Sequence, residues 1–163
     1  MSTLRVIIAD DHPRYRQGLA TLLTRSGMEV VAEAANAWAA LKAVDRASPD
    51  VVVLDLHMPG PSADEVIRRL TGGTPAYRVM VLSMSARQSD VSSALVAGAG
   101  GYLLKDAPGD EIAAGVRAVA AGESVFALPV AATPVAARPR QSTPERKVAS
   151  RRGWVRTILE ALG

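Results

Sequence analysis

Short apolar runs alternate along the chain with longer stretches that repeat apolar residues every three or four positions. The short runs are rich in Val, Ile and Leu, which is typical of strands buried on both faces of a sheet. The longer stretches have the spacing of helices that bury one side. The predicted strands cover residues 4–9, 28–34, 51–54, 78–82 and 102–104.

A predicted helix follows each of these strands. Asn36 is a suitable N-cap, and Ser62 with Glu65 has the form of a capping box. Gly27 and Gly122 end the first and last helices. Because strands and helices alternate, the crossovers should be right-handed and the sheet parallel, with helices on both faces. The sequence predicts an α/β fold, a doubly wound (βα)5 domain with a five-stranded parallel sheet.

The composition changes after this domain, which we expect to span residues 1–122. Residues 123–144 are rich in Pro and Ala and are predicted to be a linker, and 145–163 to be a short basic amphipathic tail with a possible helix. Residues 1–137 carry 12 Lys and Arg against 14 Asp and Glu, whereas 138–163 carry 7 against 2. The net charge of +3 therefore comes from the tail, which favours an acidic partner.

The composition also narrows the class of protein. There are no cysteines, which excludes disulfides and thiolate metal sites. The sequence has no run of eighteen apolar residues and does not begin like a signal peptide. We therefore expect a cytoplasmic protein without a membrane partner.

Polar residues stand at the carboxyl ends of four predicted strands. Parallel strands bring these ends to one edge of the sheet, which is where open α/β folds place ligands. Three clustered carboxylates need a counter-charge, and Mg²⁺ bound through carboxylates, a carbonyl and water would supply it. The residues are Asp10 and Asp11, Asp55, Ser83 and Lys105.

Each of these residues also has an ordinary structural interpretation. Asp10 or Asp11 alone is equally compatible with a helix N-cap, and Asp55 with a turn that closes a strand. Lys105 alone is typical of a solvated strand end, and Tyr102 of a core position. His12 and His57 are not expected to bind the metal through their side chains, because no third soft ligand accompanies them.

Taken together, these positions resemble the receiver domain of bacterial two-component response regulators. The resemblance covers residues 4–122 and is closest to the NarL/FixJ subfamily, whose members carry a LuxR-type helix-turn-helix. It implies a flavodoxin-like fold. The motifs are Asp10-Asp11, the block from Leu54-Asp55 to Met58-Pro59-Gly60, Ser83, and Gly101-Tyr102-Leu103-Leu104-Lys105-Asp106.

The resemblance implies that Asp55 accepts a phosphoryl group from a sensor histidine kinase. Asp11, Asp55 and the backbone carbonyl of His57 would bind Mg²⁺, and Asp10 would act largely through a metal-bound water. The protein would phosphorylate and dephosphorylate itself slowly and would act as a signalling switch, not as an enzyme. Its output would be the control of transcription, with a homodimer as one possible partner arrangement.

The resemblance also implies which residues respond when Asp55 is phosphorylated. Lys105 would pair with Asp55 and then with the phosphate, and Ser83 would bind a phosphate oxygen. Tyr102 would then turn inward into the vacated space. Two departures from the family pattern are Ala63, where Gly is common, and Met84, where a small residue is common.

The carboxyl end departs further from the family. Residues 142–146 resemble the start of a LuxR-type output domain, but such a domain needs on the order of 60 residues. The output domain is therefore expected to be truncated or degenerate. DNA binding would require a supplied output domain or the basic tail alone.

Three other functions fit part of the pattern. A haloacid-dehalogenase-like phosphatase also uses an Asp nucleophile with Mg²⁺, but that family has a second Asp where this chain has His57. A dinucleotide-binding module would need a Gly-rich loop after the first strand. A stand-alone DNA-binding regulator would depend on the tail.

Overall fold

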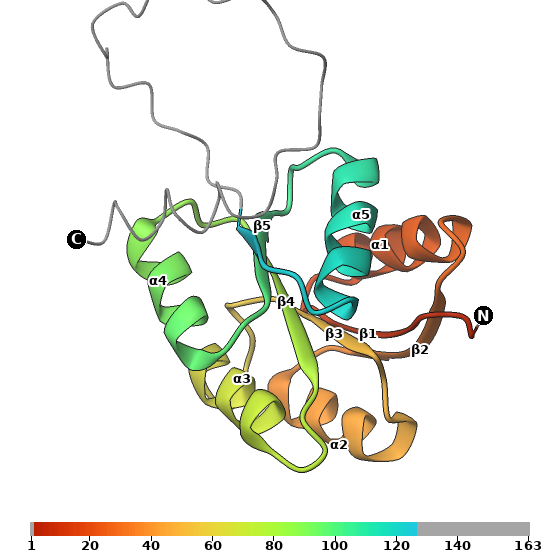
Figure 1. Cartoon of the computed structure of the whole chain (residues 1–163). Coiled ribbons are helices and arrows are strands. Elements are labelled where there is room, and N and C mark those ends of the chain that lie inside the picture. Colours follow the sequence, from red (N-terminus) through yellow and green to blue (C-terminus); the bar gives the residue numbers. More distant parts are fainter. Residues whose placement is uncertain (1, 127–163) are drawn as a thin grey trace, which may run out of the picture.

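The computed structural model describes residues 2–126 of the chain, and Figure 1 shows how their helices and strands alternate. The strands are β1 (Arg5–Ala9), β2 (Glu29–Ala34), β3 (Val51–Leu54), β4 (Arg78–Ser83), β5 (Gly101–Leu104) and β6 (Val125–Phe126). The helices are α1 (Pro13–Arg25), α2 (Ala37–Ala47), α3 (Ala63–Gly72), α4 (Gln88–Ala97) and α5 (Gly109–Ala120).

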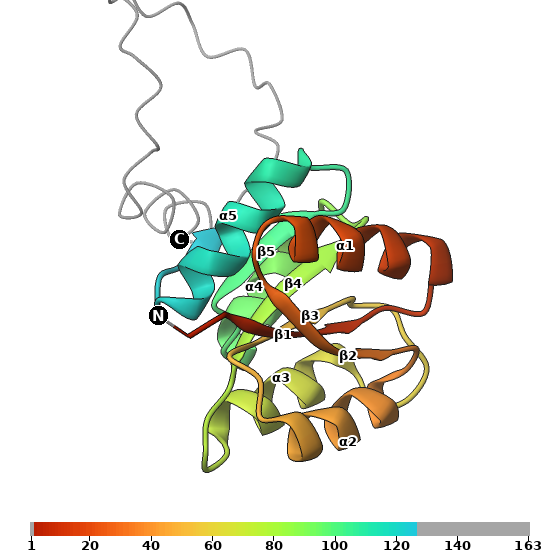
Figure 2. The ribbon, with the colours of Figure 1, turned by 90° about the vertical axis from the view of Figure 1, so that its right-hand side faces the viewer.

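The strands form one parallel sheet in the order β2-β1-β3-β4-β5-β6. Helices α1 and α5 cover one face, and α2, α3 and α4 cover the other (Figures 1 and 2). Residues of β1 alternate between the two cores: Ile7 packs with α2 to α4, whereas Val6 and Ile8 pack with α1 and α5. The predicted doubly wound α/β fold is therefore confirmed.

Side-chain caps hold two helices where the sequence predicts their starts. Asn36 Oδ1 accepts a hydrogen bond from the Ala39 amide (2.8 Å) at the start of α2. Ser62 Oγ accepts one from the Glu65 amide (3.2 Å) at the start of α3. These bonds satisfy amides that have no partner within the helix, so both helices start at defined positions beside the carboxyl edge of the sheet.

The sheet has six strands, and the prediction of five was wrong. Strand β6 pairs in parallel with β5, with Gly101 opposite Val125 and Tyr102 opposite Phe126. The Phe126 side chain is buried in the core beneath α2 to α4. A strand of two residues is too short to show an alternating pattern, which is why the sequence did not reveal it.

Strand β6 falls inside the range 123–144 that the sequence assigns to a linker. The rest of that predicted linker and the predicted tail at 145–163 lie outside the described residues. None of the helices formed by residues 2–126 is long and apolar enough to cross a membrane.

Candidate functional site

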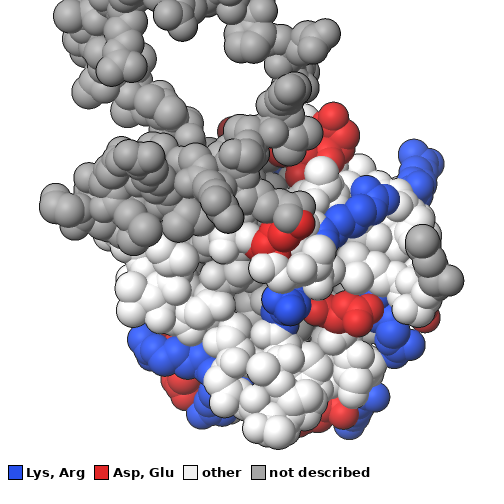
Figure 3. All heavy atoms as spheres, in the orientation of Figure 1, with Lys and Arg blue, Asp and Glu red and all other residues white. Residues whose placement is uncertain are grey.

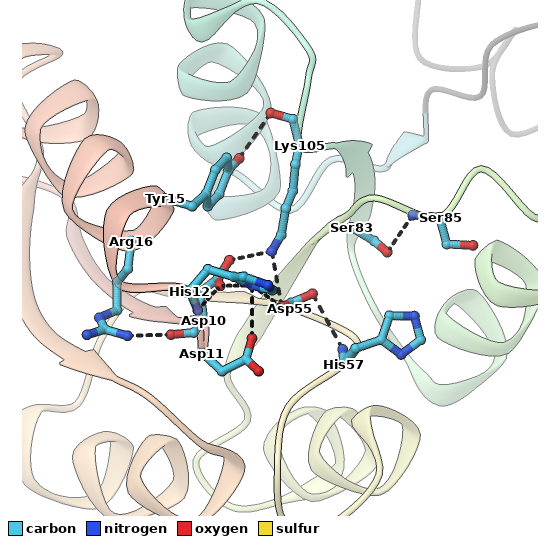
Figure 4. A network of polar contacts seen from close by, with 10 residues as sticks. All are labelled: Asp10, Asp11, His12, Tyr15, Arg16, Asp55, His57, Ser83, Ser85 and Lys105. Carbon is cyan, nitrogen blue, oxygen red and sulfur yellow. Dashed lines mark hydrogen bonds and ion pairs between the residues drawn. The ribbon is translucent and has the colours of Figure 1, made fainter.

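The structure brings the predicted strand-end residues to one edge of the sheet, as Figure 4 shows. Asp10 and Asp11 follow β1, Asp55 follows β3, Ser83 ends β4 and Lys105 follows β5. Backbone hydrogen bonds extend the ladder into this edge. The Asp55 amide donates to the carbonyl of the last residue of β1, and the Lys105 amide donates to the Ser83 carbonyl, each at 2.9 Å.

A buried ion triad forms the centre of the site. Lys105 Nζ lies 2.7 Å from Asp10 Oδ2 and 3.1 Å from Asp55 Oδ2. The three side chains are 3–5% exposed, so water screens their charges weakly. The Lys105 ammonium also lies 4.8 Å from the centre of the Tyr15 ring, at cation–π distance. One ammonium therefore serves two buried carboxylates.

The electrostatic balance disfavours the charged form of Asp55. Burial raises the pKa of the Asp55 carboxyl above its ordinary value, and the Asp10 carboxylate raises it further. The hydrogen bond and charge of Lys105, and the hydrogen bond from the His57 amide, act in the opposite direction without reversing the shift. Additional positive charge at this site would therefore stabilise the Asp55 anion.

The side chain of His12 enters the same cluster. Its Nδ1 lies 3.0 Å from Asp11 Oδ1, 3.2 Å from Asp10 Oδ1 and 3.9 Å from Asp55 Oδ2. The His12 amide also donates to Asp10 Oδ1 (2.8 Å). The sequence pattern did not predict a metal-binding role for the His12 imidazole. Its position directly after the acidic pair and before the helix does indicate that it lies near these carboxylates.

The site fits a divalent cation. Asp10, Asp11, His12 and Asp55 each offer one ligand atom, and these atoms all lie within 4.8 Å of one another. Among residues 2–126, Asp11 Oδ1 is buried and has no hydrogen-bond partner, and its 3.0 Å contact with His12 Nδ1 is an ion pair. A buried carboxylate oxygen without a donor is suited to a hard cation.

The contact between His57 and Asp55 involves the backbone of His57. The His57 amide donates to Asp55 Oδ1 at 3.4 Å, and His57 itself is exposed. Figure 4 shows that the ring points away from the carboxylates. The His57 imidazole therefore lies outside the carboxylate cluster.

The predicted switch residues are connected through Ser85. The Ser85 amide donates to Ser83 Oγ (3.0 Å), and the Tyr102 hydroxyl donates to the Ser85 carbonyl (2.7 Å). The Ser85 hydroxyl makes a short hydrogen bond to Asp90 of α4. Tyr102 is fully buried, and burial raises the pKa of its phenol. The ring already lies inside the protein in this structure.

Two side chains of α1 support the site and were not identified as functional from the sequence. Arg16 donates from Nη1 to the Asp10 carbonyl (2.6 Å) and pairs through Nε with Glu33 Oε1 (3.4 Å). The Tyr15 hydroxyl donates to the Lys105 carbonyl (3.3 Å). Burial, helped by the Asp10 and Asp55 carboxylates, raises the pKa of Tyr15 to about 12, so this phenol is neutral at physiological pH.

The two positions that depart from the family pattern lie outside the ion triad. Met84, directly after Ser83, is 72% exposed and stands at the surface of the β4–α4 loop. Ala63 is the first residue of α3. Neither residue carries a charge, so the electrostatics of the triad do not depend on them.

Comparison with known proteins agrees with this geometry. The response regulator receiver domain family matches residues 6–117. The chain is 39% identical over 123 residues to the nitrate/nitrite response regulator protein NarP of Escherichia coli, covering 75% of this chain and 57% of that protein. It is 37% identical over 123 residues to the DNA-binding transcriptional activator DevR/DosR of Mycobacterium tuberculosis, with the same coverage of each. The chain thus spans little more than half the length of these curated relatives.

Solved structures show the same fold. The signal receiver domain of the response regulator NarL from Mycobacterium tuberculosis superposes with a TM-score of 0.72 at 35% identity, covering 76% of this chain and all of that one. A LuxR-family response regulator from Aurantimonas sp. SI85-9A1 gives 0.71 at 36% identity, covering 76% of this chain and 89% of that one. Since the family match spans more than half of its residues, the chain belongs to the response regulator receiver domain family.

Proposed function

We propose that this chain is a phosphorylation-controlled switch of a two-component system, with Asp55 as the phosphoacceptor. The observation that carries the proposal is the buried Asp55 carboxylate held 3.1 Å from Lys105 Nζ at the ligand-binding edge of the sheet. In the reaction, a carboxylate oxygen of Asp55 attacks the phosphorus of a kinase phosphohistidine. The P–N bond breaks, the histidine takes up a proton, and an aspartyl phosphate forms.

Asp11, Asp55 and the backbone carbonyl of His57 would hold Mg²⁺, with Asp10 acting through water. The unsatisfied buried oxygen of Asp11 supports this assignment. When bound, the ion supplies positive charge that neutralises the phosphoryl oxygens. Lys105 already contacts an oxygen of Asp55, so its ammonium is placed to pair with the phosphate once Asp55 is modified.

Ser83 can take its proposed role by redirecting its hydroxyl. Its oxygen accepts a hydrogen bond from the Ser85 amide, and its side chain also bonds to the Tyr102 phenol, so the hydroxyl hydrogen would turn from Tyr102 to a phosphate oxygen. A phosphoryl group adds between one and two negative charges and several acceptor oxygens, and contacts of this kind bias a switch between two close conformers. Because Tyr102 is already buried, phosphorylation would stabilise this inward conformer.

The switch would turn over only slowly. Self-phosphorylation from small phosphodonors and self-dephosphorylation would occur at the same Asp55 carboxylate, without a separate substrate. The phosphatase alternative finds no support, because residue 57 is an exposed histidine where a haloacid-dehalogenase-like enzyme has a second Asp.

The output would be control of transcription, which the name of the relative DevR/DosR states for that protein. A sensor histidine kinase would be the phosphodonor, the relay would operate in the cytoplasm, and a homodimer would form on phosphorylation. Figure 3 shows acidic and basic side chains interspersed on one face of the described domain. We therefore do not propose DNA contact through that face of the domain.

A comparison of the intact protein with Asp55→Asn tests the proposal. Acetyl phosphate with Mg²⁺ should add one phosphoryl group to the former and none to the latter, measured by intact mass. Beryllofluoride with Mg²⁺ should shift the amide resonances near Ser83 and Tyr102 in the intact protein alone. Equal modification of both proteins, or repeated turnover of a generic phosphomonoester, would contradict the proposal.

A further inference from the structure

We propose that His12 makes the acidic cluster a mixed nitrogen and oxygen site that binds Co²⁺ or Zn²⁺ through Nδ1, whereas Mg²⁺ binding requires the ring to leave. The inference rests on the proposed function only in taking the cluster as a metal site. It concerns a ligand that receives no role in phosphoryl transfer. Its basis is the position of one imidazole nitrogen among three carboxylate groups.

The backbone holds His12 in place before any ion arrives. His12 is the N-cap residue of α1, and its side chain makes no capping hydrogen bond. The His12 amide donates to Asp10 Oδ1 at 2.8 Å, and Pro13 follows directly with a restricted backbone. The ring instead faces the cluster: its Nδ1 is hydrogen-bonded to Asp10 Oδ1 at 3.2 Å and lies 3.0 Å from Asp11 Oδ1 and 3.9 Å from Asp55 Oδ2, so a bound cation would replace this hydrogen bond.

These distances place Nδ1 where a ligand atom would stand. The set of Asp10, Asp11, His12 and Asp55 provides three carboxylate oxygens and one imidazole nitrogen, all within 4.8 Å of one another. Four ligands of this kind match what Zn²⁺ and Co²⁺ accept. Small adjustments of the side chains would bring the four atoms to metal–ligand distances, with Lys105 still compensating the remaining negative charge.

Mg²⁺ makes different demands on the same residues. It prefers six oxygen ligands in an octahedron, keeps several waters and has little affinity for imidazole nitrogen. A ring with Nδ1 among the carboxylates occupies space that those waters need. The His12 side chain is 67% exposed, so it has room to swing toward solvent when Mg²⁺ binds. His12 should therefore favour transition metals and give no help to Mg²⁺.

The consequence is competition at the phosphorylation site. A Co²⁺ or Zn²⁺ ion bound by His12 together with the carboxylates would exclude Mg²⁺ from the same cluster. The metal content of the surroundings would then act on the switch through this one side chain.

The test is calorimetric titration of the full chain with MgCl₂, CoCl₂ or ZnCl₂ at one fixed pH and ionic strength. His12→Ala should raise the Kd for Co²⁺ and Zn²⁺ by about tenfold or more, the scale of losses seen when a metal site is disturbed. The Kd for Mg²⁺ should stay unchanged or fall. His12→Asn, which suits an N-cap and offers an oxygen in place of nitrogen, should show the same loss of preference.

Two further variants serve as controls. His57→Ala removes the other imidazole of the chain, whose ring lies outside the cluster, and retains the backbone carbonyl proposed to bind the metal, so it should keep the wild-type preference for Co²⁺ over Mg²⁺. Asp11→Asn should weaken the binding of Mg²⁺, Co²⁺ and Zn²⁺ by a similar factor. Nitrogen NMR of the imidazole rings gives a second measurement: saturating Zn²⁺ should shift His12 Nδ1 as a bound ligand, and Mg²⁺ should not.

The inference fails if His12→Ala changes the affinity for Mg²⁺ and Co²⁺ by the same factor, or if Zn²⁺ leaves the His12 resonances unmoved. It also fails, together with the proposed metal site, if the wild-type chain binds none of the three ions. If Mg²⁺ binds and Asp55 is phosphorylated as proposed while His12→Ala has no selective effect, only the inference falls.

Discussion

Replacement of Lys105 by methionine tests the electrostatics of the site directly. Met has a similar length, so the change removes the ammonium and keeps most of the packing. With an effective dielectric of about 20, each of the contacts at 2.7 and 3.1 Å contributes roughly 5–6 kcal/mol of Coulomb attraction. The variant also recovers the desolvation penalty of the ammonium, so the net destabilisation is about 3–5 kcal/mol.

Urea unfolding followed by far-UV circular dichroism in metal-free buffer measures this loss. In a separate thermal unfolding experiment, Lys105→Met should lower the melting temperature of a domain of this size by roughly 10–20 °C. The loss should be larger at neutral pH than at acid pH, because protonation of Asp55 relieves the uncompensated charge. Mg²⁺ should restore part of the stability, since the ion supplies positive charge to the same carboxylates.

Lys42→Met is the matched control. Lys42 is an exposed residue of α2 that makes no ion pair within the described residues, so its replacement should change stability by no more than about 0.5 kcal/mol. A double-mutant cycle with Asp55→Asn isolates one contact, and the Lys105→Met loss should shrink in that background. If Lys105→Met matched the Lys42 control, or if its loss were the same in both backgrounds, the account of the triad would be wrong.

Three other changes probe the site and its supports. The pKa of Asp55 in the folded protein lies above the ordinary 3.8, so the stability that protonated Asp55 contributes is lost as pH rises through the folded pKa. At neutral pH and without metal, Asp55→Asn should therefore raise the melting temperature. This gain should vanish in acid. Gly98 has a φ of 113°, and a Cβ there would lie 2.5 Å from the hydroxyl oxygen of Thr71 in α3. Gly98→Ala should therefore lower the free energy of unfolding by about 2–3 kcal/mol. Gly18→Ala, which places its Cβ in open space, should not lower it. Arg16→Met removes a bond to the loop after β1 and should weaken Mg²⁺ binding by calorimetry, unlike exposed Arg14→Met.

The placement of the acidic residues could be predicted from the sequence because it follows from the backbone. A buried run such as Val51–Leu54 identifies a central strand, and alternation with helices requires parallel pairing. Any residue directly after such a strand then lies at the carboxyl edge. Asp10, Asp55 and Lys105 needed no knowledge of rotamers to be placed together, and they form the triad.

Side-chain direction could not be predicted in the same way. Nothing in the sequence pattern around Tyr15 indicates that its ring lies over the Lys105 ammonium. His12 was set aside because metal-site patterns in a sequence count soft ligands, whereas its Nδ1 reaches the cluster through its position at the helix start. Strand β6 was missed for a third reason, since its pairing with β5 leaves no periodic signal in two residues.

The network around Ser85 determines how far a change at Asp55 can spread. Lys105 binds Asp55 through its side chain and the Ser83 carbonyl through its amide, so β4 and β5 are joined beside the acceptor. Ser85 then links Ser83 to Tyr102, and its hydroxyl bonds to α4. Tyr102 is already buried in this structure, so the predicted inward turn of its ring has no counterpart here. If Asp55 is phosphorylated as proposed, we expect the response in the loop between β4 and α4, whose hydrogen bonds run through Ser85.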